Sequence, residues 1–259
     1  EKFCTNPIKT QKKVFDNLVS KGKNTAFGKE HHFNAITKYS HFKNNIPIRT
    51  YEEFSVYITR ARNGEQNVLW PGKIKWFSKS SGTTNAQSKF IPITKESLKE
   101  CHFKGGKDML SLYGNNFPFS DMYNGKGLML GGTIKESSKG DYKDGDLSAI
   151  LLDEFPFWVN YHRVPDIETA LLEDWEEKLE RIAQQAVKEN ITNLTGVPSW
   201  MLILLKRVLV ISGKKNISEV WPKLELYMHG GVNFEPYKEQ FKTLIPSEKM
   251  NYLEGYNAS

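Results

Sequence analysis

Residues 190 to 213 read NITNLTGVPSWMLILLKRVLVISG, and this stretch decides the fold class. The run from Ile191 to Thr195 is typical of a short strand, and Gly196 permits a turn directly after it. Pro198 suits the first turn of a helix, which we expect from Trp200 to Ile211. A strand that passes at once into a helix is a building unit of layered α/β sheets.

The same alternation continues along the chain on both sides of this stretch. Further strands are predicted at 73–80, 125–133, 224–231 and 250–259. Helices are predicted at 8–22, 51–64, 168–190 and 233–244. One more helix is predicted after residues 91–94, with Thr94 as its N-cap. We therefore expect an α/β fold of layered sheets with flanking helices.

The 168–190 segment has clear helical periodicity. Its apolar residues recur at spacings near 3.6 and are expected to form one packed face, made of Leu171, Leu172, Trp175, Leu179, Ile182, Ala183 and Ala186. The charged residues of the segment are then expected on a solvated face.

Composition excludes several classes of protein. With 39% hydrophobic residues, the 259-residue chain can bury a substantial core. The formal charge of +6 comes almost wholly from lysine, without a local basic block, so we expect no nucleic-acid partner but a surface able to attract an anionic substrate. The longest apolar run, at 200–205, is far shorter than the ~20 residues of a membrane helix, so no membrane partner is expected.

The cysteines and histidines point away from a metalloprotein or a secreted scaffold. Cys4 and Cys101 are too few and too distant to form a disulfide framework, which predicts a reducing, cytoplasmic compartment. The histidines lack the spacing of metal ligands, so we expect no histidine-bound metal. The oligomeric state is not predictable from these residues.

A polar loop follows the strand predicted at 73–80. Residues 80 to 89 read SSGTTNAQSK, and we expect them to lie between a strand and a helix. Backbone amides and hydroxyls in such a loop can surround a polyphosphate, while Lys89 neutralises its charge. The stretch is not a Walker A loop, because it lacks the second glycine and the GK[ST] ending. By itself it is equally compatible with a solvated surface turn.

Two further motifs lie at predicted strand ends. HGG at 229–231 ends one strand, and paired glycines there let a ligand lie directly on the backbone. The alternative interpretation is a tight turn. YNAS at 256–259 ends the last strand and offers an aromatic ring, an amide and a hydroxyl.

Together, and in this order, the three motifs resemble those of adenylate-forming enzymes. More closely, the chain resembles the acyl-acid amido synthetase family of auxin-responsive plant enzymes and their bacterial relatives. The resemblance covers most of the chain and rests on SSGTTNAQSKFIPIT at 80–94, GDLSAILL at 145–152, GVPSW at 196–200, EVWPKLELYMHGGVNFEPY at 219–237 and EGYNAS at 254–259.

The resemblance implies a reaction and its cofactors. A carboxylic acid would be adenylated by ATP with Mg²⁺, and the amine of an amino acid would then attack the acyl adenylate to give an amide. The implied ATP-binding residues are Ser80, Ser81, Gly82, Thr83, Thr84, Lys89, Gly230, Gly231, Tyr256, Asn257, Ala258 and Ser259. Of these, Thr84 and Lys89 are the implied catalytic residues. The implied acid-binding residues are His229, Val232 and Phe234, and Trp158 and Tyr161 are further aromatic candidates. A packing role is the alternative for His229, Phe234, Trp158 and Tyr161.

The chain also departs from the family pattern. Ala86 stands where such loops usually have a glycine, and the chain stops at Ser259, where the family continues with a glutamate that helps to hold magnesium. No metal ligand is therefore expected within the chain. We expect residues 1–259 to be part of the large N-terminal adenylation domain, without the C-terminal domain, and to be inactive in isolation. An acyl-CoA ligase and a non-catalytic nucleotide- or acyl-binding module remain alternatives.

Overall fold

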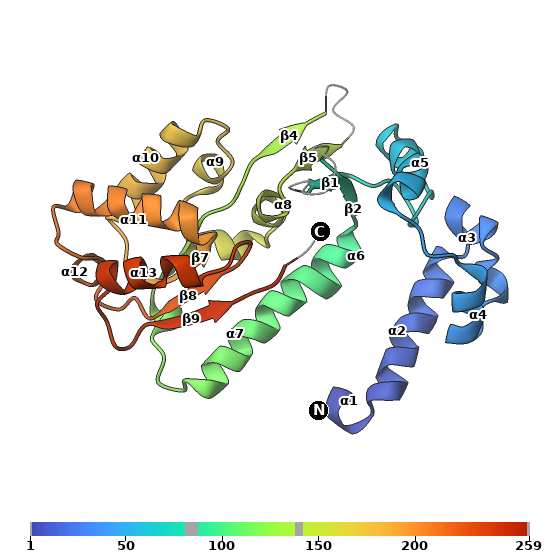
Figure 1. Cartoon of the computed structure of the whole chain (residues 1–259), viewed down its shortest axis with the longest axis horizontal. Helices are drawn as coiled ribbons and strands as arrows, with labels where there is room; N and C mark the ends of the chain where they lie inside the picture. The colour runs from blue at the N-terminus through green and yellow to red at the C-terminus, as the bar shows by residue number, and fades with distance from the viewer. Residues whose placement is uncertain (1, 81–87, 138–141, 258–259) are drawn as a thin grey trace. The chain divides into compact units, whose positions relative to one another are not determined.

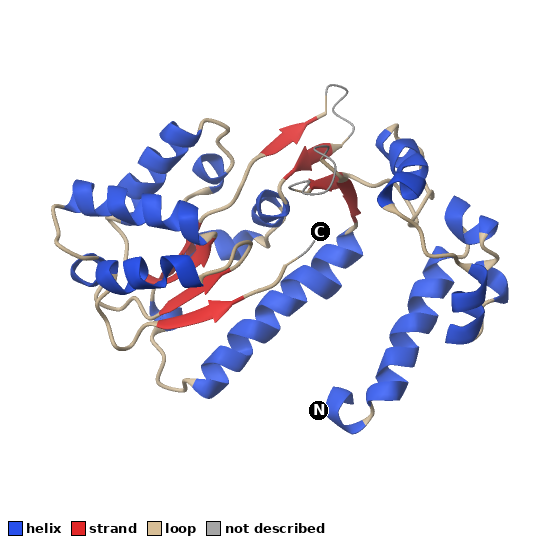
Figure 2. Ribbon diagram, viewed as in Figure 1, coloured by secondary structure: helices blue, strands red, loops and turns tan. Residues whose placement is uncertain are grey.

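The computed structural model describes residues 2–80, 88–137 and 142–257 (Figure 1). The chain divides into two compact units, which are described separately. The N-terminal unit comprises Glu1–Lys95 and Glu136–Asp144, and the C-terminal unit comprises Glu96–Lys135 and Gly145–Ser259. From β6 (Arg163–Val164) onward, strands and helices alternate as the sequence predicts (Figure 2).

The N-terminal unit is mostly helical. Its helices are α1 (Lys2–Thr5), α2 (Pro7–Gly22), α3 (Ala26–Glu30), η1 (Phe33–Ala35), α4 (Tyr39–Asn45) and α5 (Tyr51–Arg62). The helices predicted at 8–22 and 51–64 are confirmed as α2 and α5. A capping box starts α5, because Thr50 and Glu53 each accept a hydrogen bond from the backbone amide of the other. Phe27, Tyr57 and Phe77 belong to the core of this unit.

An antiparallel hairpin carries the polar loop. Strands β1 (Trp76–Lys79) and β2 (Phe90–Ile93) pair from Trp76 opposite Ile93 to Lys79 opposite Phe90. The expectation that the loop lies between a strand and a helix is therefore wrong, because the residues after it pair back onto β1. In the sheet order β2-β1-β5-β4, strand β2 lies at an edge. Strands β4 (Ile134–Glu136) and β5 (Lys143–Gly145) contain the boundaries between the two units.

The C-terminal unit is built on a five-stranded parallel sheet in the order β6-β3-β7-β8-β9. Its strands are β3 (Lys126–Met129), β6 (Arg163–Val164), β7 (Ile191–Gly196), β8 (Leu226–His229) and β9 (Asn251–Glu254). Strands of a parallel sheet are covered on both faces, so they read as continuous apolar runs. All four side chains of β8 are accordingly buried.

Helices cover both faces of this sheet (Figure 1). From Lys95 onward the helices are α6 (Lys95–Ser97), η2 (Leu98–Phe103, π-helical), α7 (Lys104–Asn116), η3 (Met122–Asn124), α8 (Leu147–Asp153), η4 (Phe157–His162), α9 (Ile167–Ala170), α10 (Trp175–Ala186), α11 (Pro198–Ser212), α12 (Ile217–Val220), η5 (Glu235–Tyr237) and α13 (Lys238–Leu244). On one face Tyr227 packs with Phe241 of α13. On the other face Leu226 and Met228 pack with Tyr113 of α7.

The single helix predicted at 168–190 is in fact two helices. Asp166 accepts a hydrogen bond from the amide of Thr169 and caps α9, and Asp174 accepts one from the amide of Glu177 and caps α10. Leu171 and Leu172 lie in the turn between these helices and not on a continuous helical face. The two N-caps, Asp166 and Asp174, therefore start two separate helices, although the apolar spacing alone predicts one.

The charged face of α10 is also not wholly solvated. Lys178 is fully buried, with 1% of its surface exposed, because it lies three and four residues from Trp175 and Ile182 on the packed side of the helix. The expectation that every charge of this segment faces solvent is therefore wrong.

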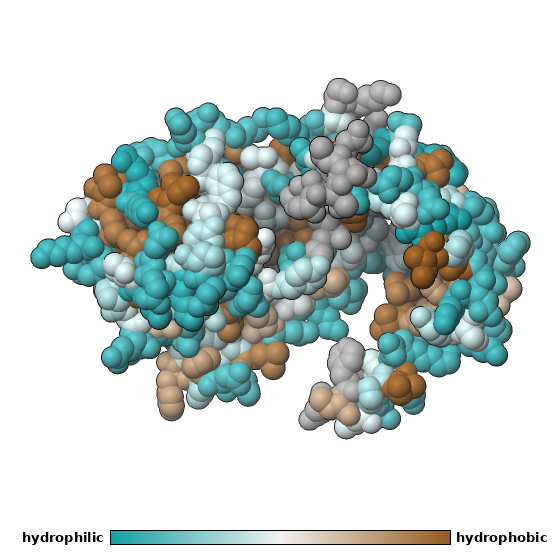
Figure 3. Space-filling view, viewed as in Figure 1, coloured by the Kyte–Doolittle hydropathy of each residue, from teal (hydrophilic) through white to brown (hydrophobic). Residues whose placement is uncertain are grey.

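No helix in the described ranges is long and apolar enough to cross a bilayer. The apolar run at 200–205 lies within α11, where Met201, Leu202, Leu204 and Leu205 are buried. Hydrophilic side chains cover most of the face drawn in Figure 3, as a lysine-rich surface predicts.

Candidate functional site

Glycines gather at the carboxyl ends of the parallel strands. Because these ends lie at one edge of a parallel sheet, we name the set the glycine edge: Gly131, Gly132, Gly196, Gly230, Gly231 and Gly255. Within this sheet, the strand that follows β3 in sequence is β6, which lies on one side of β3, whereas the strand that follows β7 is β8, which lies on the other side of β7. Open α/β sheets bind ligands outside the carboxyl ends of their strands at such a reversal of strand order.

The HGG motif is packed backbone against backbone. The amide of Gly255 donates a hydrogen bond to the carbonyl of His229 at 2.7 Å. A Cβ atom on Gly230 would lie 2.2 Å from the carbonyl oxygen of Gly255, so no larger residue fits. Gly231 has a φ of +83°, which favours glycine, and a Cβ there would meet Val197 at 3.4 Å. Gly230 is therefore required by packing and Gly231 by its backbone conformation, in addition to any contact with a ligand.

His229 and Phe234, two of the predicted acid-binding residues, lie together. Their rings stack with centroids 4.0 Å apart and help to line a cavity of about 270 Å³, whose other lining residues are Asn233, Glu235, Lys238, Tyr252 and Glu254. Burial lowers the pKa of His229, and the nearby carboxylate of Glu254 opposes this shift only in part. The imidazole is therefore mainly neutral at pH 7.

The other predicted residues of this region lie outside that cavity. Val232 is 40% exposed and Tyr256 is 95% exposed. The side-chain oxygen of Asn257 lies 3.1 Å from Nδ1 of His102, in the π-helical segment η2. Trp158 and Tyr161 are exposed on η4. Ala258 and Ser259 lie outside the described residues.

A buried ammonium group holds the turn that follows β3. Nζ of Lys178 donates hydrogen bonds to the carbonyl oxygens of Gly131 at 3.0 Å and Gly132 at 2.7 Å. Burial lowers the pKa of Lys178 to about 8, and the carboxylate of Asp146 opposes the shift. The sequence analysis missed this residue, although a lysine at a core spacing of an amphipathic helix is a detectable signal.

The polar loop is closed at its base. The amide of Ser80 donates to the carbonyl of Lys89 at 2.8 Å, and the amide of Lys89 donates to Oγ of Ser80 at 3.3 Å. The hairpin therefore places these two predicted ATP-binding residues side by side. The others, Ser81, Gly82, Thr83 and Thr84, lie outside the described residues, as does Ala86.

Tyr51 contacts the same hairpin and was missed by the sequence analysis. Its hydroxyl accepts a hydrogen bond from the amide of Phe90 at 2.7 Å, and the Nζ atom of Lys89 lies 5.4 Å from the centre of its ring. No local signal identifies this contact, because Tyr51 and Phe90 are 39 residues apart.

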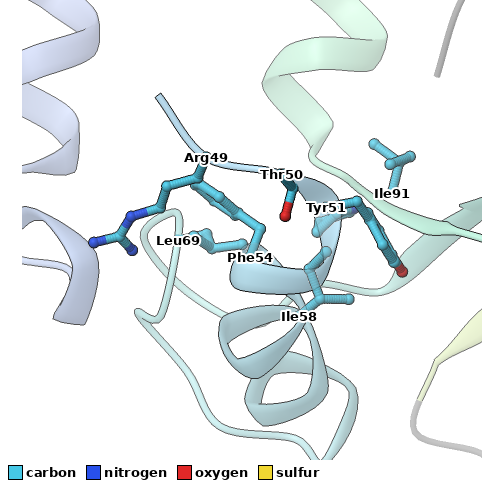
Figure 4. A pocket seen from close by; sticks show the side chains of 8 residues that line it. Arg49, Thr50, Tyr51, Phe54, Ile58, Leu69 and Ile91 are labelled. Atoms are coloured by element: carbon cyan, nitrogen blue, oxygen red, sulfur yellow. The ribbon is translucent and has the colours of Figure 1, made fainter. Parts of the chain in front are cut away.

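Tyr51 also lines a cavity of about 310 Å³ in the N-terminal unit (Figure 4). Its other lining residues are Arg49, Thr50, Phe54, Ile58, Leu69, Ile91 and Pro92. The guanidinium of Arg49 points away from the apolar side chains and donates to the hydroxyl of Tyr57 at 3.2 Å. The cavity is therefore mainly apolar, without paired carboxylates for acid–base chemistry.

Metal-ligating side chains do not cluster in the part of the chain that the structure describes. Across residues 2–80, 88–137 and 142–257, no group of three or more His, Cys, Asp or Glu residues is arranged to hold a metal ion. These residues therefore give no basis for assigning a ligand to magnesium.

Comparison with known proteins now decides the family. The GH3 family N-terminal domain matches residues 1–250. The chain belongs to the GH3 family. The resemblance drawn from the motifs is thereby confirmed.

Curated relatives of this GH3 chain match it over limited segments. It is 30% identical over 139 residues to jasmonoyl-L-amino acid synthetase JAR4 of Nicotiana attenuata, covering 53% of this chain and 23% of that protein. It is 32% identical over 101 residues to indole-3-acetic acid-amido synthetase GH3.15 of Arabidopsis thaliana, covering 39% of this chain and 17% of that protein.

Solved structures of GH3 proteins share the fold. GH3.15 acyl acid amido synthetase superposes with a TM-score of 0.75 at 17% identity, covering 98% of this chain and 52% of that one. AtGH3.15 acyl acid amido synthetase in complex with 2,4-DB superposes with a TM-score of 0.77 at 16% identity, covering 96% of this chain and 52% of that one. The chain thus spans about half the length of these structures.

Proposed function

We propose that this GH3 chain forms part of the adenylating domain of an ATP-dependent acyl acid amido synthetase. Membership of the GH3 family carries the proposal, because the curated relatives are named as synthetases that join an acid to an amino acid. The same names favour an amide over a thioester product. Coverage of 52% of the solved relatives supports the view that residues 1–259 are one portion of such an enzyme.

The proposed reaction has two steps. A carboxylate oxygen of the acid attacks the α-phosphorus of ATP, the bond from that phosphorus to the bridging oxygen breaks, and pyrophosphate leaves. The amine of an amino acid then attacks the acyl carbon, loses a proton, and displaces AMP to form the amide. Neither step needs a protein nucleophile, so positioning and electrostatic stabilisation are the protein's main contributions.

The described residues fit parts of this chemistry. Ser80 and Lys89 meet at the base of the polar loop, where an ammonium group can offset phosphate charge. At the glycine edge a ligand can approach the backbone closely, because the glycines have no side chains. We propose that Gly230, Gly231, Tyr256 and Asn257 contact the nucleotide there. Ser81, Gly82, Thr83, Thr84, Ala258 and Ser259 are also proposed as contacts of the nucleotide. His229, Val232 and Phe234 are proposed for the acid.

Magnesium would accompany ATP and offset the charge of its phosphates. We propose the cytoplasm as the compartment, because Cys4 and Cys101 are free thiols, as is typical of a reducing environment. The partners proposed are small molecules, a carboxylic acid and an amino acid.

Calorimetry with ATP and Mg²⁺ tests the nucleotide site on the 259-residue chain. We expect weak binding, and we expect Lys89→Ala to reduce the affinity about tenfold, the size of one lost charge-assisted contact. Lys43→Ala removes an exposed lysine of α4 and is the matched control, expected to leave affinity unchanged. Equal affinities of the wild type and Lys89→Ala would contradict the assignment of the loop.

ATP–pyrophosphate exchange with a panel of carboxylic acids tests the reaction. We expect none from the 259 residues alone, and exchange when they are joined to the remaining half of a GH3 relative. Products formed with amino acids or with coenzyme A then separate an amido synthetase from an acyl-CoA ligase. Nucleotide binding without exchange in the joined protein would favour a non-catalytic module.

A further inference from the structure

We propose that Tyr51 is a positioning residue that aims Lys89 from the base of the polar loop. This inference rests on the proposed function, because it takes Lys89 to be the cation that meets the phosphates of ATP. Its basis is geometric: Tyr51 contacts the hairpin both at the backbone of Phe90 and at the ammonium group of Lys89.

The hydroxyl of Tyr51 fixes the backbone where the chain returns from the loop. It accepts a hydrogen bond from the amide of Phe90 at 2.7 Å and lies 3.4 Å from the carbonyl oxygen of the same residue, to which it donates. Strand β2 is at the sheet edge, so the outward backbone groups of this strand have no neighbouring strand to bond. Tyr51 therefore takes the place of a strand partner at the residue after Lys89.

The ring of Tyr51 faces the side chain of Lys89. Nζ lies 5.4 Å from the ring centre, within the range of a cation–π interaction. The charge of Lys89 also acts on the neighbouring carboxylate of Glu52. The pKa of Glu52 is lowered, chiefly by a hydrogen bond from its own backbone and to a smaller degree by a hydrogen bond from Thr50 and by the charge of Lys89. The ammonium group is thus attracted toward the start of α5, which limits the directions in which it can point.

Tyr51 is itself held in place. It is the first residue of α5, directly after Thr50, whose hydroxyl and the carboxylate of Glu53 form the capping box. Its side chain lines the apolar cavity together with Phe54, Ile58 and Ile91 (Figure 4). Because the ring is fixed at a helix terminus, it can restrict the positions of the Lys89 ammonium group. A charged group that binds a ligand needs such a defined position.

A double-mutant cycle tests the coupling between Tyr51 and Lys89 in ATP affinity. Tyr51→Phe keeps the ring and removes the hydroxyl, and Tyr51→Leu removes both. We expect affinity to fall about twofold for the first and about fivefold for the second, since a neutral hydrogen bond and a cation–π contact are each modest. Tyr142→Phe is the matched control in the same unit, since its ring packs on Phe77, and it should leave affinity unchanged.

The deciding measurement is Tyr51→Leu made on top of Lys89→Ala. If Tyr51 acts through Lys89, the second change should alter the affinity by less than about 1.5-fold, because the group that Tyr51 positions is already gone. A fivefold loss in both backgrounds would overturn the inference and leave Tyr51 with a structural role. Absence of ATP binding by the wild type would instead contradict the proposed function.

Amide hydrogen exchange provides a readout without nucleotide. The amide of Phe90 should exchange at least about tenfold faster in Tyr51→Phe than in the wild type, while amides of α2 keep their rates. Unchanged exchange at Phe90 would show that the hydroxyl does not hold the hairpin, and would overturn this part of the inference even if Tyr51→Leu failed to fold.

Discussion

The hairpin base and the glycine edge, where we propose contacts with the nucleotide, are held together in different ways. At the hairpin base, side chains make the contacts. The hydroxyls of Ser80 and Tyr51 accept hydrogen bonds from the backbone amides of Lys89 and Phe90, and the ammonium group of Lys89 carries the charge. At the glycine edge, the backbones of Gly230 and Gly255 lie directly against each other. Substitutions should therefore affect ligand binding at the hairpin base and folding at the glycine edge.

The largest expected effect comes from Gly230→Val. Its Cβ would lie 2.2 Å from the carbonyl oxygen of Gly255, and a backbone group cannot rotate away as a side chain can. We expect the free energy of unfolding to fall by about 3 kcal/mol, the upper range for overpacking. Urea unfolding measures this loss. Gly105→Ala in α7 is the control, because a Cβ there meets nothing within 4 Å, and it should not destabilise the chain.

Buried charge at the glycine edge should appear as a pH dependence. The pKa of Lys178 is about 8 in the folded chain against an ordinary 10.5, so between these values the unfolded chain binds more protons. Stability from this residue therefore rises with pH, by on the order of 1.5 kcal/mol between about pH 8 and about pH 9.5. Urea unfolding of the wild type and of Lys178→Met at both pH values measures the contribution of Lys178 to the free energy of unfolding.

The difference between wild type and Lys178→Met removes the contribution of the tyrosines, which oppose this trend. Burial raises the pKa of Tyr252 to about 12, so the stability it contributes is present at neutral pH and lost as the pH rises above its unfolded value. A constant difference between the two proteins over this range would contradict the lowered pKa of the buried Lys178.

Gly231→Ala should have a smaller effect than Gly230→Val. The φ of +83° disfavours alanine, while the nearest atom to its Cβ, in Val197, is at an ordinary 3.4 Å. We expect a loss of about 1 kcal/mol in urea unfolding, the cost of left-handed backbone for a residue with a Cβ. Gly213→Ala, at φ +66° with nothing within 4 Å, should lose the same amount. A much larger loss at Gly231 would indicate tight packing on Val197.

The smallest effect is expected at the hairpin base. Ser80→Ala removes the 3.3 Å hydrogen bond from the amide of Lys89 but keeps the 2.8 Å bond from the Ser80 amide to the Lys89 carbonyl. We expect a loss of about 0.5 kcal/mol, because a long and partly solvated bond contributes little. Thermal unfolding measures it. A loss as large as that of Gly230→Val would abolish the contrast between the two regions.

Most helices and strands were predictable, because their signals are local. Pro198 begins α11 as expected, and Thr50 begins α5 with its capping box. The prediction failed where local signals competed, since Asp166 and Asp174 divide a segment whose apolar spacing alone reads as one helix. Of the candidate site, the positions of the motifs were predictable, but the partners of their residues were not.

The sequence by itself determined the alternation of strands and helices, the order of the three motifs and the resemblance to amido synthetases, because composition, periodicity and turn residues act over a few positions. Only the tertiary structure decided that the polar loop joins two antiparallel strands and that Tyr51 reaches Phe90. It alone placed Gly230 against Gly255 and buried Lys178 under the turn after β3. The contacts of Tyr51, Gly230 and Lys178 join residues 25 to 47 positions apart, and no local propensity specifies which strand edges and helix faces meet.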